Sequence, residues 1–197
     1  MNARSSVRRI AAALAAFALT ATPLAHARAQ DVYGSTPSRY AIELYLAQYW
    51  LDVPGRDREG LGGVGARMMF GRGDVTKAAS SLFNRARAGV FATYTSEQKD
   101  VSTWHVGGQL DVPLFAAPVA SGVLDPFVSL GAGLFRSSVD VIGRTDSRND
   151  FAFTPAVGTL VPVTGAIKFR GDLRDVIVFG DDRTNNFVAE AGISVGF

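Results

Sequence analysis

From residue 40 onward, apolar and polar residues alternate in stretches of roughly ten residues, and short segments rich in Gly, Pro, Asp and Ser separate them. A period of two indicates β-strands whose two faces differ. No helical period competes with it, so the pattern predicts an all-β, antiparallel up-and-down sheet. The eight predicted strands are Tyr40–Trp50, Leu61–Phe70, Phe83–Tyr94, Trp104–Leu114, Phe127–Phe135, Phe151–Val161, Gly165–Val178 and Phe187–Phe197.

One face of each predicted strand is apolar and the other carries charge. In the seventh stretch the polar positions are Lys168, Arg170, Asp172 and Arg174. The charged face could be the solvent face of a soluble sheet, or it could line the interior of a membrane barrel whose apolar face meets lipid. Glycines on the polar faces favour the second interpretation, because they make room for long side chains in a narrow lumen. They are Gly63, Gly65, Gly131, Gly133, Gly192 and Gly196.

Aromatic residues gather where the predicted strands begin and end. Belts of rings at both lipid boundaries are typical of membrane barrels. The sequence therefore predicts an eight-stranded transmembrane β-barrel. One predicted belt contains Tyr40, Phe70, Phe83, Phe115, Phe127 and Phe197, and the other contains Trp50, Tyr94, Trp104, Phe135, Phe151 and Phe187.

The N-terminus has the three parts of an export signal: a basic region with Arg4, Arg8 and Arg9, an apolar run over 10–20, and small residues at 27–29. We expect residues 1–29 to be a Sec-type signal peptide that is cleaved, leaving residues 30–197 as the barrel domain. Loss of its four arginines changes the formal net charge from +2 to −2. The mature chain is therefore not expected to bind nucleic acid. Without cysteine, thiol chemistry and disulfides are excluded.

An exported chain with an even number of strands keeps both termini in the periplasm. The loops facing outward are then predicted at 51–60, 95–103, 136–150 and 179–186, where charged residues are frequent. The periplasmic turns fall at 71–82, 115–126 and 162–164. Val176 and Val178 lie two and four residues after Arg174, so in a regular strand they would share its polar face despite being apolar. The seventh strand is therefore predicted to bulge near Asp175 or to leave the lipid there.

The last stretch resembles the β-signal that the barrel-assembly machinery reads in bacterial outer-membrane proteins. Segments 125–133 and 169–175 are similar to parts of the small outer-membrane barrels related to OmpA and OmpX. The resemblance implies a location in the Gram-negative outer membrane, contact with its lipid and lipopolysaccharide, and assembly with periplasmic chaperones; we expect a monomer without a peptidoglycan-binding domain. The predicted assembly signal is Phe187, Ala189, Ala191, Ile193, Val195 and Phe197.

Ionisable residues on the polar faces should meet inside the barrel, where buried charges are tolerated only in pairs. We expect the acidic members to pair with arginine and lysine and to fill the lumen. This network would either fix the barrel shape or act as a rearrangeable gate for ions. The predicted set is Glu43, Arg67, Arg87, His105, Asp111, Lys168, Arg170, Asp172, Arg174 and Glu190.

Catalysis and metal binding are not expected. Some small outer-membrane barrels modify lipid A, which requires a nucleophilic serine beside a histidine and a carboxylate. His105 is the single histidine after cleavage, and it is predicted to face the lumen, where lipid does not reach. No calcium-loop spacing is present and no cofactor is expected. The sequence favours a structural or surface-interaction protein; a narrow gated channel is the alternative, and a lipid A modifying enzyme the third possibility.

Overall fold

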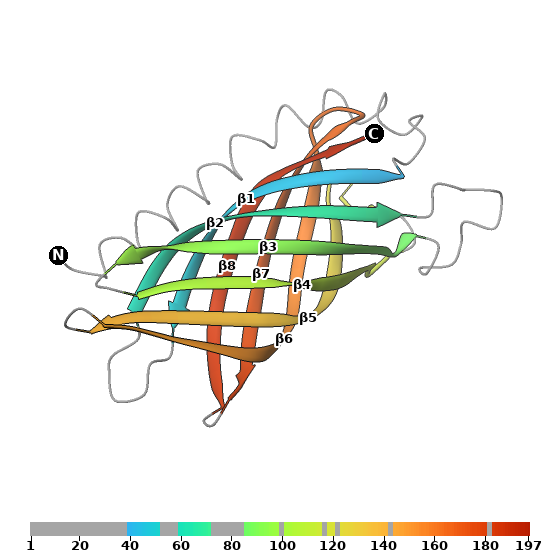
Figure 1. Ribbon diagram of the computed structural model, residues 1–197. Helices are drawn as coiled ribbons and strands as arrows, with labels where there is room; N and C mark the ends of the chain where they lie inside the picture. Colours follow the sequence, from blue (N-terminus) through green and yellow to red (C-terminus); the bar gives the residue numbers. More distant parts are fainter. Residues whose placement is uncertain are drawn as a thin grey trace.

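The computed structural model describes residues 39–51, 59–71, 85–98, 101–115, 118–120, 123–141, 144–180 and 183–197. Each strand pairs antiparallel with its sequence neighbours, and β1 also pairs with β8, which closes the sheet into a barrel (Figure 1). The predicted eight-stranded antiparallel barrel is confirmed. The predicted signal peptide, 1–29, lies outside the described residues. The strands are β1 (Tyr40–Leu51), β2 (Glu59–Gly71), β3 (Arg87–Gln98), β4 (Val101–Pro113), β5 (Asp125–Val141), β6 (Arg144–Pro162), β7 (Ile167–Phe179) and β8 (Thr184–Gly196).

We call the end of the barrel where β1 begins and β8 ends the terminal end, and the opposite end the hairpin end. Two loops predicted at the hairpin end are wrong. Most of 136–150 is paired strand, because β5 and β6 continue to the pair Val141 and Arg144, and β3 and β4 occupy most of 95–103. Backbone pairing does not require apolar side chains, so charged strand ends looked like loops. The third strand begins at Arg87; the predicted start, Phe83, lies outside the described residues.

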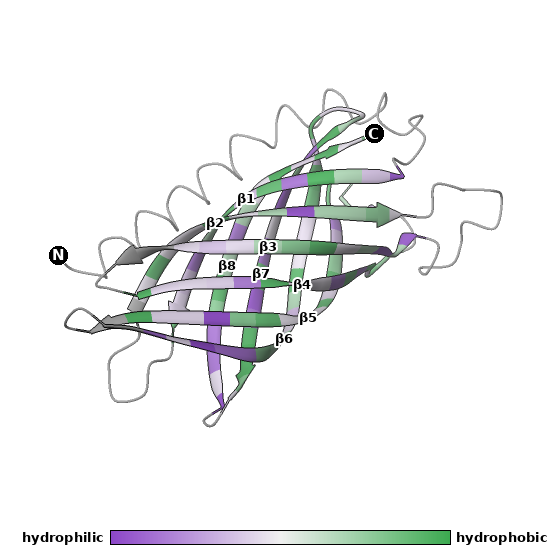
Figure 2. Cartoon of the chain, in the orientation of Figure 1, coloured by the Kyte–Doolittle hydropathy of each residue, from purple (hydrophilic) through white to green (hydrophobic). Residues whose placement is uncertain are grey.

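Apolar side chains cover the outside of the barrel. Leu44, Leu46 and Leu134 are 64%, 68% and 65% exposed, whereas Glu43 and Arg67 are 1% and 2% exposed on the inside. Figure 2 shows polar and apolar residues following one another along single strands. An apolar exterior around a charged interior is stable only where the exterior meets lipid rather than water. None of the described residues forms a helix long and apolar enough to cross a membrane.

Charged side chains gather in the terminal half of the interior, whereas the hairpin half is mainly apolar, which corrects the expectation of a polar lumen throughout. The buried polar side chains of the hairpin half include Thr95, Thr103 and Asn186. Toward the hairpin end, side chains from seven strands form an apolar layer. Val176 and Val178 belong to it, 0% and 5% exposed, and β7 keeps an unbroken register with β8 from Ile167 to Val178. The predicted bulge near Asp175 is therefore wrong. The apolar layer contains Tyr45, Ala47, Tyr49, Leu51, Leu61, Val101, Phe135, Ala152, Val176, Val178 and Val188.

Aromatic rings form a row at each end of the outer face. At the terminal end Tyr40 lies 6.0 Å from both Phe70 and Phe197, measured between ring centroids. At the hairpin end the contacting pairs are Trp50 with Phe187, Tyr94 with Trp104, and Phe151 with Phe179. The assignment of Phe127 and Phe135 to the belts is wrong: they are 3% and 5% exposed and point inward, because they share the parity of Ser129 on β5.

Candidate functional site in the barrel interior

Eight ionisable side chains meet inside the terminal half of the barrel. Strand parity places them there, since each occupies an inward position. Four of them are acidic and four are arginines, so the group has no net charge. All except Arg87 are at most 6% exposed. We call them the interior charged cluster: Glu43 on β1, Arg67 on β2, Arg87 on β3, Asp111 on β4, Arg170, Asp172 and Arg174 on β7, and Glu190 on β8.

Two arginines hold together a pair of acidic residues that would otherwise repel. Asp172 and Glu190 stand directly opposite each other in the β7–β8 register, where like charges are destabilising. Arg67 contacts Glu190 and lies 3.3 Å from Asp172, while Arg174 lies 3.4 Å from Glu190 and 3.8 Å from Asp172. Both carboxylates are therefore neutralised from two sides.

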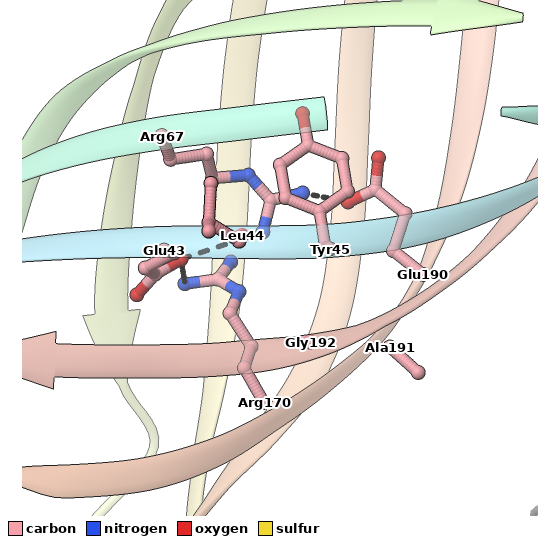
Figure 3. A pocket seen from close by; sticks show the side chains of 8 residues that line it. All are labelled: Glu43, Leu44, Tyr45, Arg67, Arg170, Glu190, Ala191 and Gly192. Atoms are coloured by element: carbon pink, nitrogen blue, oxygen red, sulfur yellow. Dashed lines mark ion pairs between the residues drawn. The ribbon is translucent and has the colours of Figure 1, made fainter. Parts of the chain in front are cut away.

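Arg170 is the centre of the other half of the cluster. Its Nη1 lies 2.5 Å from Asp111 and 3.3 Å from Glu43, and its Nε donates to Asp172 at 2.8 Å. Arg87 closes the group at the terminal end, 3.2 Å from Asp111. Figure 3 shows Arg67 and Arg170 approaching Glu43 from two different strands. The pocket that these side chains line has no space for a water molecule.

Aromatic rings support the guanidinium groups. Arg67 lies 4.0 Å above the centre of the Tyr45 ring, and Arg170 lies 4.3 Å above that of Phe127, distances typical of cation–π contacts. Tyr45 lies across Gly65, where an added Cβ would meet the ring at 2.3 Å, and its hydroxyl is 2.7 Å from Thr93 Oγ1. Sequence reasoning missed these rings, although the glycine opposite Tyr45 was a usable signal.

The structure does not bring His105 and Lys168 into the cluster, although both face inward. His105 lies between the rings of Phe91 and Phe135, at 4.7 and 5.8 Å between centroids. Within the described part of the chain, Lys168 forms no ion pair. The described residues also contain no group of three or more acidic, histidine or cysteine side chains that could hold a metal ion.

A closed sheet with an apolar exterior, rows of aromatic rings at both ends and paired charges inside defines a membrane-spanning β-barrel. Residues 11–194 match the model of the outer membrane protein beta-barrel domain. The chain belongs to this family, and its place is the bacterial outer membrane.

Solved structures share this fold. Neisserial surface protein A is 14% identical, with a TM-score of 0.63 over 81% of this chain and 98% of that one. Ail, the attachment invasion locus protein of Yersinia pestis, is 13% identical, with a TM-score of 0.53 over 82% and 99%. The N-terminal barrel domain of Pseudomonas aeruginosa OprF is 12% identical, with a TM-score of 0.52 over the same shares. No curated protein matched the chain.

Proposed function

We propose that this protein is a closed outer-membrane barrel with a structural or surface-interaction role, in which the interior is a packed core rather than a pore. The observation that carries the proposal is the filling of the lumen: the interior charged cluster and the apolar layer lie one above the other, and each is buried. An ion would have to displace paired arginines and then cross an apolar layer, where it would lose its hydration.

We further propose that the terminal end faces the periplasm and the hairpin end faces outward, among lipopolysaccharide and external partners. Cleavage after Ala29 and recognition of the β8 assembly signal by the barrel-assembly machinery belong to the same proposal. On expression of the full sequence in a Gram-negative host, the mass of the outer-membrane form should correspond to residues 30–197. An outer-membrane form that keeps residues 1–29 would contradict the cleavage.

A closed interior predicts no steady openings in planar lipid bilayers. The alternative, a narrow gated channel, requires the salt bridges around Arg170 and Glu190 to exchange partners. Single-channel recording of the wild type, Arg170→Ala and Glu190→Ala separates the two. Steady wild-type openings that either substitution alters would favour the channel and contradict the packed core.

We propose no catalytic role. A lipid A modifying site needs a histidine that activates a nucleophile within reach of lipid. His105 instead lies against two phenylalanine rings and is 1% exposed. Ail has been solved with the heparin analogue sucrose octasulfate. For this chain, the residues exposed at its own hairpin end determine which partners bind there.

A further inference from the structure

A row of directly paired residues crosses the outer face of four neighbouring strands at the hairpin end. Tyr94 on β3 pairs with Trp104 on β4, and Trp104 pairs in turn with Arg136 on β5. Arg136 pairs with Asn149 on β6. Figure 1 shows these strands following one another in the closed sheet. Paired residues share a face, and Trp104 is 49% exposed on the outside. We call Tyr94, Trp104, Arg136 and Asn149 the outer-face row.

Arg136 carries a positive charge onto a face that is otherwise apolar. Side chains alternate between the two faces of a strand, and every other arginine or lysine of the described strands occupies an inward position. Arg136 is exposed, and its Nη2 donates to Ser147 Oγ at 3.3 Å. Within the described part of the chain, no carboxylate lies within ion-pair distance of it. Its charge is therefore left for an anion outside the chain.

The row lies where a lipid headgroup meets its acyl chains. Its two aromatic members belong to the ring row of the hairpin end, 4.8 Å apart between centroids, and such rings mark the headgroup level. Toward the middle of the barrel, Leu134 pairs with Phe151, and they are 65% and 52% exposed. Away from it, Ser138 pairs with Ser147, so hydroxyl groups follow. The outer face thus changes from apolar to polar across the row.

The side chains of the row match a phosphorylated sugar. A guanidinium group binds phosphate through two parallel hydrogen bonds. The ring of Trp104 offers a broad apolar face with a polar edge, on which a sugar ring can lie. The amide of Asn149 both donates and accepts hydrogen bonds, as sugar hydroxyls do. A phospholipid headgroup supplies phosphate without a sugar ring, whereas lipid A joins phosphate groups to a disaccharide that carries acyl chains.

We propose that the outer-face row binds the phosphorylated sugar of a lipid A molecule, with Arg136 on the phosphate and with Trp104 and Asn149 on the sugar. Leu134 and Phe151 then contact its acyl chains. The inference rests on the orientation proposed above, which places the hairpin end in the leaflet that contains lipopolysaccharide. It gives the surface role a ligand of defined chemistry and a defined position on the barrel wall.

The test measures lipid binding by native mass spectrometry, using the protein purified from outer membranes in detergent and freed of bound lipid. Each sample receives bisphosphorylated lipid A, lipid A without its phosphates, or phosphatidylglycerol. The wild type should bind the first at least several-fold more than either of the others. Arg136→Gln should abolish the preference for the phosphorylated form, and Arg136→Lys should keep part of it. Trp104→Ala should reduce the preference for lipid A over phosphatidylglycerol.

Arg148→Gln is the matched control, because it removes the same charge from the same hairpin, one residue before Asn149 and therefore on the opposite face. It should bind like the wild type, and gel mobility of unboiled samples verifies that each variant is folded. A wild type that does not distinguish phosphorylated from dephosphorylated lipid A, or an Arg136→Gln variant that still does, would overturn the site. Equal binding of phosphatidylglycerol and bisphosphorylated lipid A would also overturn it, because the sugar would then contribute nothing.

Failure of the proposed orientation would be seen in a separate experiment. The chain has no cysteine, so Arg183→Cys places a single thiol at an exposed position of the hairpin end. A maleimide that cannot cross the outer membrane should label it in intact cells. Labelling only after the membrane is broken would contradict the orientation, whatever the lipid preference in detergent. Steady conductance in bilayers would contradict the packed core without affecting lipid A binding.

Discussion

Gly65→Ala should destabilise the barrel by about 2–3 kcal/mol, the cost of forcing extra volume into a packed interior. An alanine Cβ at this position would lie 2.3 Å from the Tyr45 ring. That ring is held in place because Arg67 stacks on it and its hydroxyl contacts Thr93. The free energy of unfolding can be measured in urea, with the folded fraction read from unboiled gels.

Gly62→Ala provides the matched control three residues away on the same strand. A Cβ there meets no atom within 4 Å, so the change should stay within about 0.5 kcal/mol. The double variant Y45A/G65A should lose less stability than the sum of the single variants, because the clash disappears with the ring. Equal effects of the two glycine substitutions would show that the ring at Tyr45 does not set the packing.

Removal of Arg67 should have the larger effect, about 3–5 kcal/mol, as expected when one partner of a buried ion pair is lost. Arg67→Met leaves Glu43, Asp172 and Glu190 without a shared cation. Glu190 then keeps its contact with Arg174, and Asp172 keeps those with Arg174 and Arg170. Urea unfolding in the same assay measures the loss.

The double variant R67M/E190Q should be more stable than Arg67→Met, because one uncompensated charge is removed with the arginine. Arg148→Ala serves as the comparison. Its ion pair with Asp150 lies at the surface, where the Arg148 side chain is 46% exposed, and such pairs contribute less than about 1 kcal/mol. A loss at Arg67 no greater than at Arg148 would mean that the interior charges are not effectively buried.

Parity along the chain was sufficient to predict the barrel and the inward position of every member of the interior charged cluster. It could not predict which groups pair. Arg170 and Asp111 lie on β7 and β4, and their contact across the lumen depends on how the strands are staggered when the sheet closes. That stagger is a property of the whole barrel rather than of any single strand.

The apolar layer and the extended β5–β6 hairpin were missed because the side chains there suggest a different environment from the one they occupy. Val176 and Val178 look lipid-facing from their chemistry, although their parity places them inside. Arg148 and Asp150 look like loop residues, although their backbone pairs with β5. His105 carries a polar side chain, yet it is placed among Phe91 and Phe135. In each case position in the strand outweighed residue type.

Pairing of β1 with β8 closes the sheet, and this step also limits how fast the barrel can fold. Ala41 pairs with Gly196, so joining these strands closes a loop of nearly the whole barrel, at an entropic cost of roughly 4–5 kcal/mol by the logarithmic dependence on loop length. The other seven hairpin contacts are local. The seam is therefore expected to form last, and a folding intermediate would expose two unpaired edges to every other nascent chain.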